Sequence, residues 1–462
     1  MGILCAQSRF TPGLRQFIVA GDPVIALTHV QVIDGTGSAV RRDQTILIDH
    51  GKILTMGAAQ SVALPQGAKV MDLSGHTAIP GLIGMHEHLF YPSGGGIPIY
   101  NEQGFSFPRL YLAAGVTTAR TGGSMETYTD LNIKKSIDAG RMPGPKLYVT
   151  GPYLEGQGAF APQQHELSGV EDARKLVQYW AFEGATSFKA YMHITRAELA
   201  ATVEEAHKRG LLVTGHLCSV GFREAAAMGI DNLEHGIMVD TEFTPGKQPD
   251  VCPAGSESSA ALAKLDIESA PVQEMIRDLV SHKVAITSTL AVFEASLPGR
   301  PPLQQRLLDA MSPQAAISYL SAKARNAETP NANSVVLLKK EMQFERAFVK
   351  AGGLLMTGAD PTGNGGALAG FADQRNIELL VEAGFTAAEA IQISTSNAAK
   401  FLGESGRIGT LTEGKQADIV VIDGDPSTRI SDIEKVQTVF KDGVGYDSAK
   451  LLQSVRGSVG LH

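Results

Sequence analysis

The chain has 462 residues, of which 43% are hydrophobic and 19% are charged, and its formal net charge is −8. Its length exceeds one average domain and suits a large α/β barrel with a small partner domain. The net negative charge and the lack of a basic run argue against a nucleic-acid partner. The sequence contains no apolar stretch of about 18 residues without charges, so we expect no membrane span.

The N-terminal segment, residues 1–22, lacks the basic start and long apolar core of a signal peptide, so we expect a loose tail. The chain contains three cysteines, Cys5, Cys218 and Cys252. This small and odd number predicts no disulfide framework and fits a reducing compartment. We therefore expect a cytoplasmic protein.

Residues 23–78 hold short β-rich runs that are separated by turn residues such as Asp34-Gly35. Short strands with polar turns predict a small sheet or sandwich. The expected strands are Val24–Ile33, Gln44–Ile48, Lys52–Met56 and Lys69–Asp72.

Residues 79–403 alternate strand-like runs with helical patterns. The clearest helix runs from Thr195 to Arg209, because Thr195 and Glu198 form a capping box and Gly210 stands where the helix would stop. Eight strands that alternate with helices predict a parallel (β/α)8 TIM barrel. The expected strands are Leu82–His86, Val116–Arg120, Lys146–Thr150, Ser187–Tyr191, Leu211–His216, Asn232–His235, Val284–Thr289 and Leu354–Ala359.

Residues 404–448 are β-rich again, with strands expected at 417–423 and Val436–Lys441. We expect them to pair with residues 23–78 in one β-sandwich domain that is discontinuous in sequence, and to be followed by a C-terminal tail at 449–462. A long segment, residues 290–353, separates the seventh and eighth barrel strands. It is either a lid at the active face or an ordinary insertion.

Candidate metal ligands stand at the ends of the predicted barrel strands. His86 and His88 are two residues apart, so both imidazoles point to the same face of an extended strand and can hold one metal ion. A barrel places its chemistry at the carboxyl ends of its strands. Each such residue alone is usually structural, but six of them at matching strand ends predict a shared site. The other four are Lys189, His216, His235 and Asp360.

The order of these motifs resembles the amidohydrolase superfamily, in the branch of imidazolonepropionase and the metal-dependent prolidase-like dipeptidases. The resemblance covers nearly the whole chain. The motifs that carry it are Gly81-Leu-Ile-Gly-Met-His-Glu-His88, Val213-Thr-Gly-His216, Glu234-His-Gly236, Thr357-Gly-Ala-Asp360, Thr395-Ser-Asn-Ala-Ala399, Gly406-Arg-Ile-Gly409 and Gly414-Lys-Gln-Ala-Asp418.

This resemblance implies a binuclear metal centre. In family members with a lysine at the end of the fourth strand, that lysine is carbamylated by CO2 and bridges two metals, whereas one-metal relatives lack it. Carbamylated Lys189 would accordingly join two divalent ions, and zinc suits the histidine-rich set best. One metal would take His86, His88 and Asp360, and the other would take His216 and His235.

The resemblance also implies a hydrolase in which a metal-bridged hydroxide attacks the substrate and Asp360 carries the proton to the leaving group. The leading hypothesis is cleavage of a C–N amide bond, in a dipeptide or an N-acyl amino acid. A lactone, a phosphoester or a cyclic amide, as in imidazolonepropionase, is the alternative at the same site. A scaffold that has lost its metals is disfavoured because all six ligand positions are filled.

Three further residues are candidate contacts of a small-molecule substrate. Tyr191 points to the same side as Lys189, and His165 lies in the loop after the third strand. Arg120 ends the second strand and would hold a carboxylate, although an internal salt bridge is the alternative use. The resemblance leaves a homo-oligomer open, with no nucleic acid and no membrane as partner.

Overall fold

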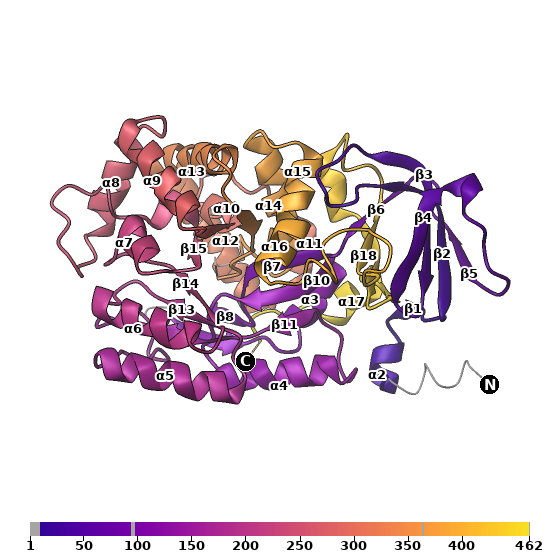
Figure 1. Cartoon of the computed structure of the whole chain (residues 1–462), viewed down its shortest axis with the longest axis horizontal. Helices are drawn as coiled ribbons and strands as arrows, with labels where there is room; N and C mark the ends of the chain where they lie inside the picture. The colour runs from indigo at the N-terminus through magenta and orange to yellow at the C-terminus, as the bar shows by residue number, and fades with distance from the viewer. Residues whose placement is uncertain (1–9, 94–97, 363–364, 462) are drawn as a thin grey trace.

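The computed structural model describes residues 10–93, 98–362 and 365–461. Parallel strands alternate with helices through the middle of the chain and gather around a common core (Figure 1). All eight predicted strands of this region are present, with the third split in two. They are β7 (Leu82–Glu87), β10 (Val116–Thr121), β11 (Lys146–Tyr148), β12 (Thr150–Leu154), β13 (Ser187–Ala190), β14 (Leu212–Gly215), β15 (Asn232–Glu234), β16 (Ala285–Ser288) and β17 (Leu355–Thr357).

These strands form a TIM-barrel-like arrangement that is not a continuous ring, which corrects the prediction of a closed barrel. One parallel sheet has the order β11-β10-β7, and a second runs from β12 to β17 in chain order. Between the β10 and β12 segments, one isolated bridge pairs Ser124 with Pro152, and the Thr150 N–H donates to Thr121 Oγ1 (2.8 Å). At the other seam, the Asp360 N–H donates to the His86 carbonyl over 2.9 Å.

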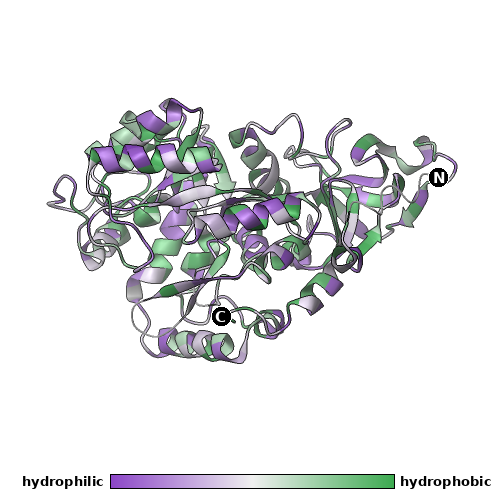
Figure 2. Ribbon diagram, turned by 90° about the horizontal axis from the view of Figure 1, so that it is seen from below, coloured by the Kyte–Doolittle hydropathy of each residue, from purple (hydrophilic) through white to green (hydrophobic). Residues whose placement is uncertain are grey.

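The helices of this region cover the strands and bury apolar faces against them. Hydrophilic and hydrophobic residues alternate along the peripheral helices (Figure 2). The predicted capping box at Thr195 and Glu198 is present at the start of α6. The helices are α3 (Phe107–Ala113), α4 (Thr127–Asp138), α5 (Val170–Glu183), α6 (Arg196–His207), α7 (Phe222–Ala227), α8 (Gly255–Lys264), α9 (Ala270–Ser281), α13 (Ala332–Lys350), α14 (Phe371–Glu382), α15 (Ala387–Gln392) and α16 (Ala398–Phe401).

Strands from both ends of the chain share a nine-stranded sheet beside the barrel (Figure 1). β18 pairs antiparallel with β6, which joins the C-terminal strands to the N-terminal ones. The structure records one sheet here, so the two-sheet sandwich stays a prediction. The strands are β1 (Ile18–Ala20), β2 (Val24–Val32), β3 (Arg41–Asp49), β4 (Lys52–Ala58), β5 (Lys69–Asp72), β6 (His76–Pro80), β18 (Ile419–Asp423), β19 (Val436–Lys441) and β20 (Val444–Asp447).

The described residues of the two predicted tails, 10–22 and 449–461, contact the rest of the fold, whereas residues 1–9 lie outside the described residues. Leu14 and Phe17 are buried at one end of the sheet, around α2 (Pro12–Arg15), and β1 pairs with β20. At the other end, α17 (Ser448–Ser454) packs against α3. Apolar side chains in both segments gain burial there, and sequence periodicity over so few residues does not reveal it.

The predicted absence of disulfides is wrong, because Cys218 and Cys252 form one, with their Cα atoms 4.9 Å apart. It links the loop after β14 to the loop before α8. The two cysteines are distant in sequence, so only the fold brings them together; Cys5 lies outside the described residues.

The segment between β16 and β17 is mostly helical. α13 packs against neighbouring barrel elements, including α8 and α10 (Leu290–Glu294), whereas α11 (Gln305–Ala310) and α12 (Pro313–Glu328) form the added part. Within the described ranges, no helix is both long and apolar enough to cross a membrane.

Candidate metal centre

The predicted ligands converge at the carboxyl ends of the parallel strands. His86 lies in β7 and Lys189 in β13. His216 and His235 directly follow β14 and β15, and Asp360 is the third residue after β17. Parallel strands end at one edge of a sheet, so strand order alone carries these side chains to a common place.

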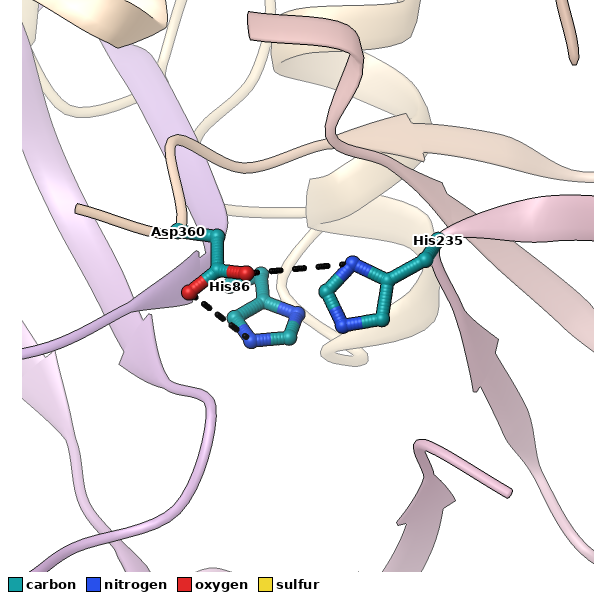
Figure 3. Close-up of side chains that lie close together, drawn as sticks. All are labelled: His86, His235 and Asp360. Carbon is teal, nitrogen blue, oxygen red and sulfur yellow. Dashed lines mark ion pairs between the residues drawn. The ribbon is translucent and has the colours of Figure 1, made fainter. Parts of the chain in front are cut away.

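His86, His235 and Asp360 form a compact cluster of side chains. One ligand atom from each lies within 4.8 Å of the others. Figure 3 shows the Asp360 carboxylate beside the two imidazoles, with one ion-pair contact to each ring. Its Oδ1 is 3.8 Å from His86 Nε2, and its Oδ2 is 3.9 Å from His235 Nδ1. Two imidazoles and a carboxylate at these distances can hold a divalent metal ion.

His88 and His216 stand beside this cluster. His88 Nε2 is 3.3 Å from Asp360 Oδ1, and the His216 ring centroid is 4.5 Å from that of His235. Five of the six predicted ligands therefore line one small space. The cluster joins His86 to His235, which the resemblance assigns to different metals, because the Asp360 carboxylate contacts both rings.

Outward hydrogen bonds fix the imidazole rings so that their Nε2 atoms remain available. The His88 Nδ1–H donates to the Gly123 carbonyl (3.2 Å), and His86 Nδ1 bonds Glu234 Oε2 (2.8 Å). His235 Nδ1 bonds Thr289 Oγ1 over 2.7 Å, and its buried Nε2 has no hydrogen-bond partner among the described residues. In metal sites, a histidine ligand is typically held by a hydrogen bond to its second ring nitrogen. The residues present therefore fit the metal ions that the resemblance implies.

Burial sets the protonation of the cluster. Burial lowers the pKa of His86, His216 and His235, and the pKa of His216 falls to about 3. These rings are therefore neutral and offer lone pairs. Burial alone would raise the pKa of Asp360, but the surrounding histidines outweigh it and hold that pKa well below its usual range. The carboxylate is therefore ionised in the centre.

Lys189 is fully buried, and its Nζ has no hydrogen-bond partner in the part of the chain that the structure describes. Its nearest ion-pair contact is Glu234 Oε1 at 4.0 Å. Burial lowers the pKa of the amine to about 8, and the charge of Arg120 acts in the same direction. An unpartnered amine with a lowered pKa suits reaction with CO2, which requires the neutral form.

Arg120 does not reach the open side of the centre, which corrects its predicted role as a substrate contact. Its buried guanidinium donates to Glu234 Oε1 (2.6 Å) and to the Met85 carbonyl (2.8 Å). Glu234 also accepts from Thr214 and contacts His86, as described above. The chain Arg120–Glu234–His86 thus supports a ligand from beneath, which is the internal salt bridge that the sequence left as the alternative.

The other two predicted substrate contacts have different outcomes. The Tyr191 ring lies 5.0 Å from that of His216 and stands at the centre, where its contact with substrate stays a prediction. The side chain of His165 is 54% exposed and pairs with Asp172 at 2.9 Å. His165 is therefore engaged by Asp172, whereas its predicted place at the mouth stays a prediction.

Backbone conformation positions two of the ligands. His235 and Asp360 have φ angles of 69° and 45°, in the left-handed region that side chains other than glycine rarely adopt. Such strain costs about 1–3 kcal/mol and clusters at functional sites. Gly122 and Gly358 make room for His86, because a Cβ at either would lie within 2.3 Å of its ring or backbone nitrogen.

Sequence reasoning missed the residues that hold the ligands. Glu234 carried a signal, since it directly precedes His235 in a matched motif. Thr289 and Gly122 carried none, because their role depends on which strands become neighbours.

Residues 307–445 match the sequence family described as "Amidohydrolase family", and this match includes Asp360 but none of the histidine ligands. A search of curated proteins finds no match. Among solved structures, "AH, Bottromycin amidohydrolase" is similar over 97% of this chain and 96% of its own, at 21% identity and a TM-score of 0.71. "Crystal structure of a Xaa-Pro dipeptidase with bound methionine in the active site" covers 92% and 100%, at 20% identity and a TM-score of 0.69.

At these identities the structures establish the fold, and the family match adds the sequence evidence. Together with the predicted motifs, these findings agree with the sequence-based resemblance to the amidohydrolase superfamily, and the direct family match covers residues 307–445.

Proposed function

We propose that this chain hydrolyses a C–N amide bond of a small molecule at a centre of two divalent metal ions. The observation that carries the proposal is the convergence of neutral imidazoles, an ionised carboxylate and an unpartnered buried lysine at one set of strand ends. His86, His88 and Asp360 would hold one ion and His216 and His235 the other, with carbamylated Lys189 between them. Dipeptides and N-acyl amino acids are the first substrates to consider.

The metal ions would activate a water molecule near neutral pH and polarise the substrate carbonyl. Zinc is the metal that best suits the histidine-rich set of ligands. The protein residues do the rest. Asp360 accepts a proton from the attacking water and delivers it to the nitrogen of the leaving amine. The carbonyl carbon gains the water oxygen as the C–N bond breaks, which leaves a carboxylate and an amine.

Glu234 and Thr289 hold His86 and His235 in the orientation that presents Nε2 to the centre. Arg120 keeps the buried Glu234 ionised, because its positive charge lies 2.6 Å from the carboxylate. Lys189 supplies an anionic bridge only when it is carbamylated, since a free ammonium would repel the metal ions.

The test is hydrolysis of a panel of dipeptides, N-acyl amino acids, lactones and phosphotriesters by zinc-loaded protein, with and without a chelator. We expect chelator-sensitive release of an amine from amides. Asp360→Asn should lower kcat by about 10²–10⁴-fold, the usual range for loss of a general acid–base group, with the circular dichroism spectrum unchanged.

Asp373→Asn serves as the control, because Asp373 is also a buried aspartate but bonds the Gly370 backbone N–H at the start of α14. It should retain far more activity than Asp360→Asn. Turnover of lactones or phosphotriesters alone would keep the metal site and overturn the amide assignment. A near-normal kcat in Asp360→Asn would remove that residue from proton transfer.

A further inference from the structure

A continuous row of aromatic rings lines one side of the metal centre. We define this aromatic wall as Phe90, Tyr100, Tyr153, Phe160 and Tyr191. Its rings connect one ligand to another, because Phe90 stacks on His88 at 4.4 Å and Tyr191 meets His216 at 5.0 Å. Between these ends, ring centroids are 5.0 Å apart for Phe90 and Tyr100, 6.0 Å for Tyr100 and Phe160, and 5.7 Å for Phe160 and Tyr191.

The wall rises from the buried centre to the surface. Phe90 is 1% exposed, whereas Phe160 is 36% exposed. Tyr153 fills the space behind, with its ring 4.8 Å from that of Tyr191. Burial and the negative charge of Asp360 together raise the pKa of Tyr100 to about 12. They also raise the pKa values of Tyr153 and Tyr191. The three phenols are therefore neutral and lie near the carboxylate.

The mouth of the centre is poor in positive charge. Six of the eight segments that follow the barrel strands contain no lysine or arginine: residues 88–106, 122–126, 155–169, 191–195, 216–221 and 358–370. The segment after β15 contains only Lys247, whose Nζ donates to the Ser219 carbonyl over 2.6 Å.

Three of the four cations in the segment between β16 and α13 are also engaged. Arg300 pairs with Glu294 and Glu382, and Arg306 pairs with Glu434. Lys323 donates to the Pro301 carbonyl. Among the described residues of these eight segments, Arg325 is thus the only cation whose side chain no ion pair or hydrogen bond engages, and it lies exposed on α12.

Histidine does not replace them. His193 Nδ1 lies 3.5 Å from the buried side chain of Glu155, and His165 pairs with Asp172. A buried or half-buried anion without a cationic partner is costly. An aromatic ring that packs on an aromatic surface instead gains about 0.5–1.5 kcal/mol in addition to the contribution of its buried area.

We propose that the preferred substrates are amides that carry an uncharged aromatic group next to the scissile bond, and that this group packs on the aromatic wall. A free carboxylate at that position is disfavoured, so a neutral derivative of an aromatic N-acyl amino acid is preferred over its acid. This inference rests on the proposed amide hydrolysis and narrows its substrate class.

Three matched compounds test the inference on zinc-loaded protein: N-acetylphenylalanine methylamide, N-acetylphenylalanine, and N-acetylalanine methylamide. Mass spectrometry identifies the amide bond that is cleaved. We expect kcat/KM for the neutral aromatic compound to exceed that of the other two by at least about tenfold, which corresponds to about 1.4 kcal/mol. Equal or faster turnover of the acid would overturn the inference and leave the proposed function standing.

Phe160→Ala tests the wall itself. It should lower kcat/KM for the phenylalanine methylamide by about 2- to 12-fold, through KM and not kcat, because an aromatic contact made equally in ground and transition states is lost. The alanine compound should be little affected. Phe182→Ala is the control, since Phe182 is 87% exposed on the remote helix α5 and should change neither value.

Calorimetric binding of the same compounds to the metal-loaded Asp360→Asn variant separates the two proposals. If no compound is hydrolysed by the wild type, the amide assignment fails, yet tighter binding of the neutral aromatic compound would still support the wall. If that compound binds no better than the acid, or if Phe160→Ala leaves its affinity unchanged, the wall is packing only and the inference is overturned.

Discussion

At the scale of single residues, a buried charge network supports the metal ligands. Glu234 accepts from His86 Nδ1 and from Arg120, and all three side chains are almost fully buried. Burial alone would raise the pKa of Glu234, but Arg120 and Lys189 outweigh it and hold that pKa well below its ordinary value. The carboxylate is therefore ionised at neutral pH and orients the His86 ring.

Glu234→Gln keeps the shape of this side chain and removes its charge. We expect a loss of about 3–5 kcal/mol in the free energy of unfolding, because Arg120 is left buried without a counter-charge. Zinc affinity should fall by about 10–100-fold, as for other changes behind a metal ligand. Urea denaturation and competition with a chromophoric chelator measure the two effects.

Asp138→Asn is the matched control for this change. Asp138 pairs with Lys134 on the exposed side of α4, and both side chains are partly open to solvent. A surface pair of this kind contributes little, so stability should stay within about 0.5 kcal/mol of the wild type. Similar losses in both variants would show that the Glu234 network does not support the centre.

At the scale of elements, the last residues of the chain connect three separate parts of the molecule. We call residues 455–461 the C-terminal strap. Its Val459 is fully buried and exchanges backbone hydrogen bonds with Ala310 (2.9 Å) and Ser312 (2.8 Å), at the ends of α11 and α12. The Gly460 N–H donates to Gln103 Oε1 (3.0 Å), in the segment after β9 (Ile99–Glu102). The strap thus fastens the added helices to the segment that follows the His86 strand.

Truncation of the chain after Ser454 should loosen these helices. We expect faster hydrogen–deuterium exchange in residues 305–328 and a lower melting temperature, because the backbone bonds and the buried Val459 are lost. The barrel helix α6 should exchange as before.

Leu461→Ala is the control for the truncation, because Leu461 is 57% exposed and its removal uncovers little apolar surface. Unchanged exchange in the truncated protein would mean that α11 and α12 are held by their own packing.

At the scale of the whole molecule, we expect metal binding and folding to be coupled. Several strands must be in place before Asp360 and the four predicted histidine ligands can meet. A metal ion would therefore bind the native state in preference to the unfolded chain. Binding then stabilises the fold by mass action, by about 2.7 kcal/mol when free metal is about 100-fold above Kd.

Chelation should therefore lower the melting temperature without unfolding the protein at room temperature, because the large apolar core remains. Differential scanning calorimetry with and without zinc measures the shift, and elemental analysis should give two zinc ions per chain. The double variant His86→Ala and His88→Ala should not respond to zinc. A zinc-independent melting temperature in the wild type would contradict a metal site in this protein.

The sequence by itself determined the local features. The period of the apolar pattern and the capping box of α6 predicted the strand and helix order, since these depend on neighbours a few residues apart. The strand-end positions of His86, His88, Lys189, His216, His235 and Asp360 followed from that order, because parallel strands deliver their ends to one edge.

Only the tertiary structure decided what depends on distant segments meeting. The Cys218–Cys252 disulfide, the Arg120–Glu234 pair, the Thr289 contact of His235 and the strap on α11 all join residues that no local pattern relates. Short segments such as β1 contain too few residues to show a hydrophobic periodicity. Their burial depends on the surface against which they pack. The ligands were therefore visible in the sequence, while the charges that hold them and the aromatic wall that faces them required the fold.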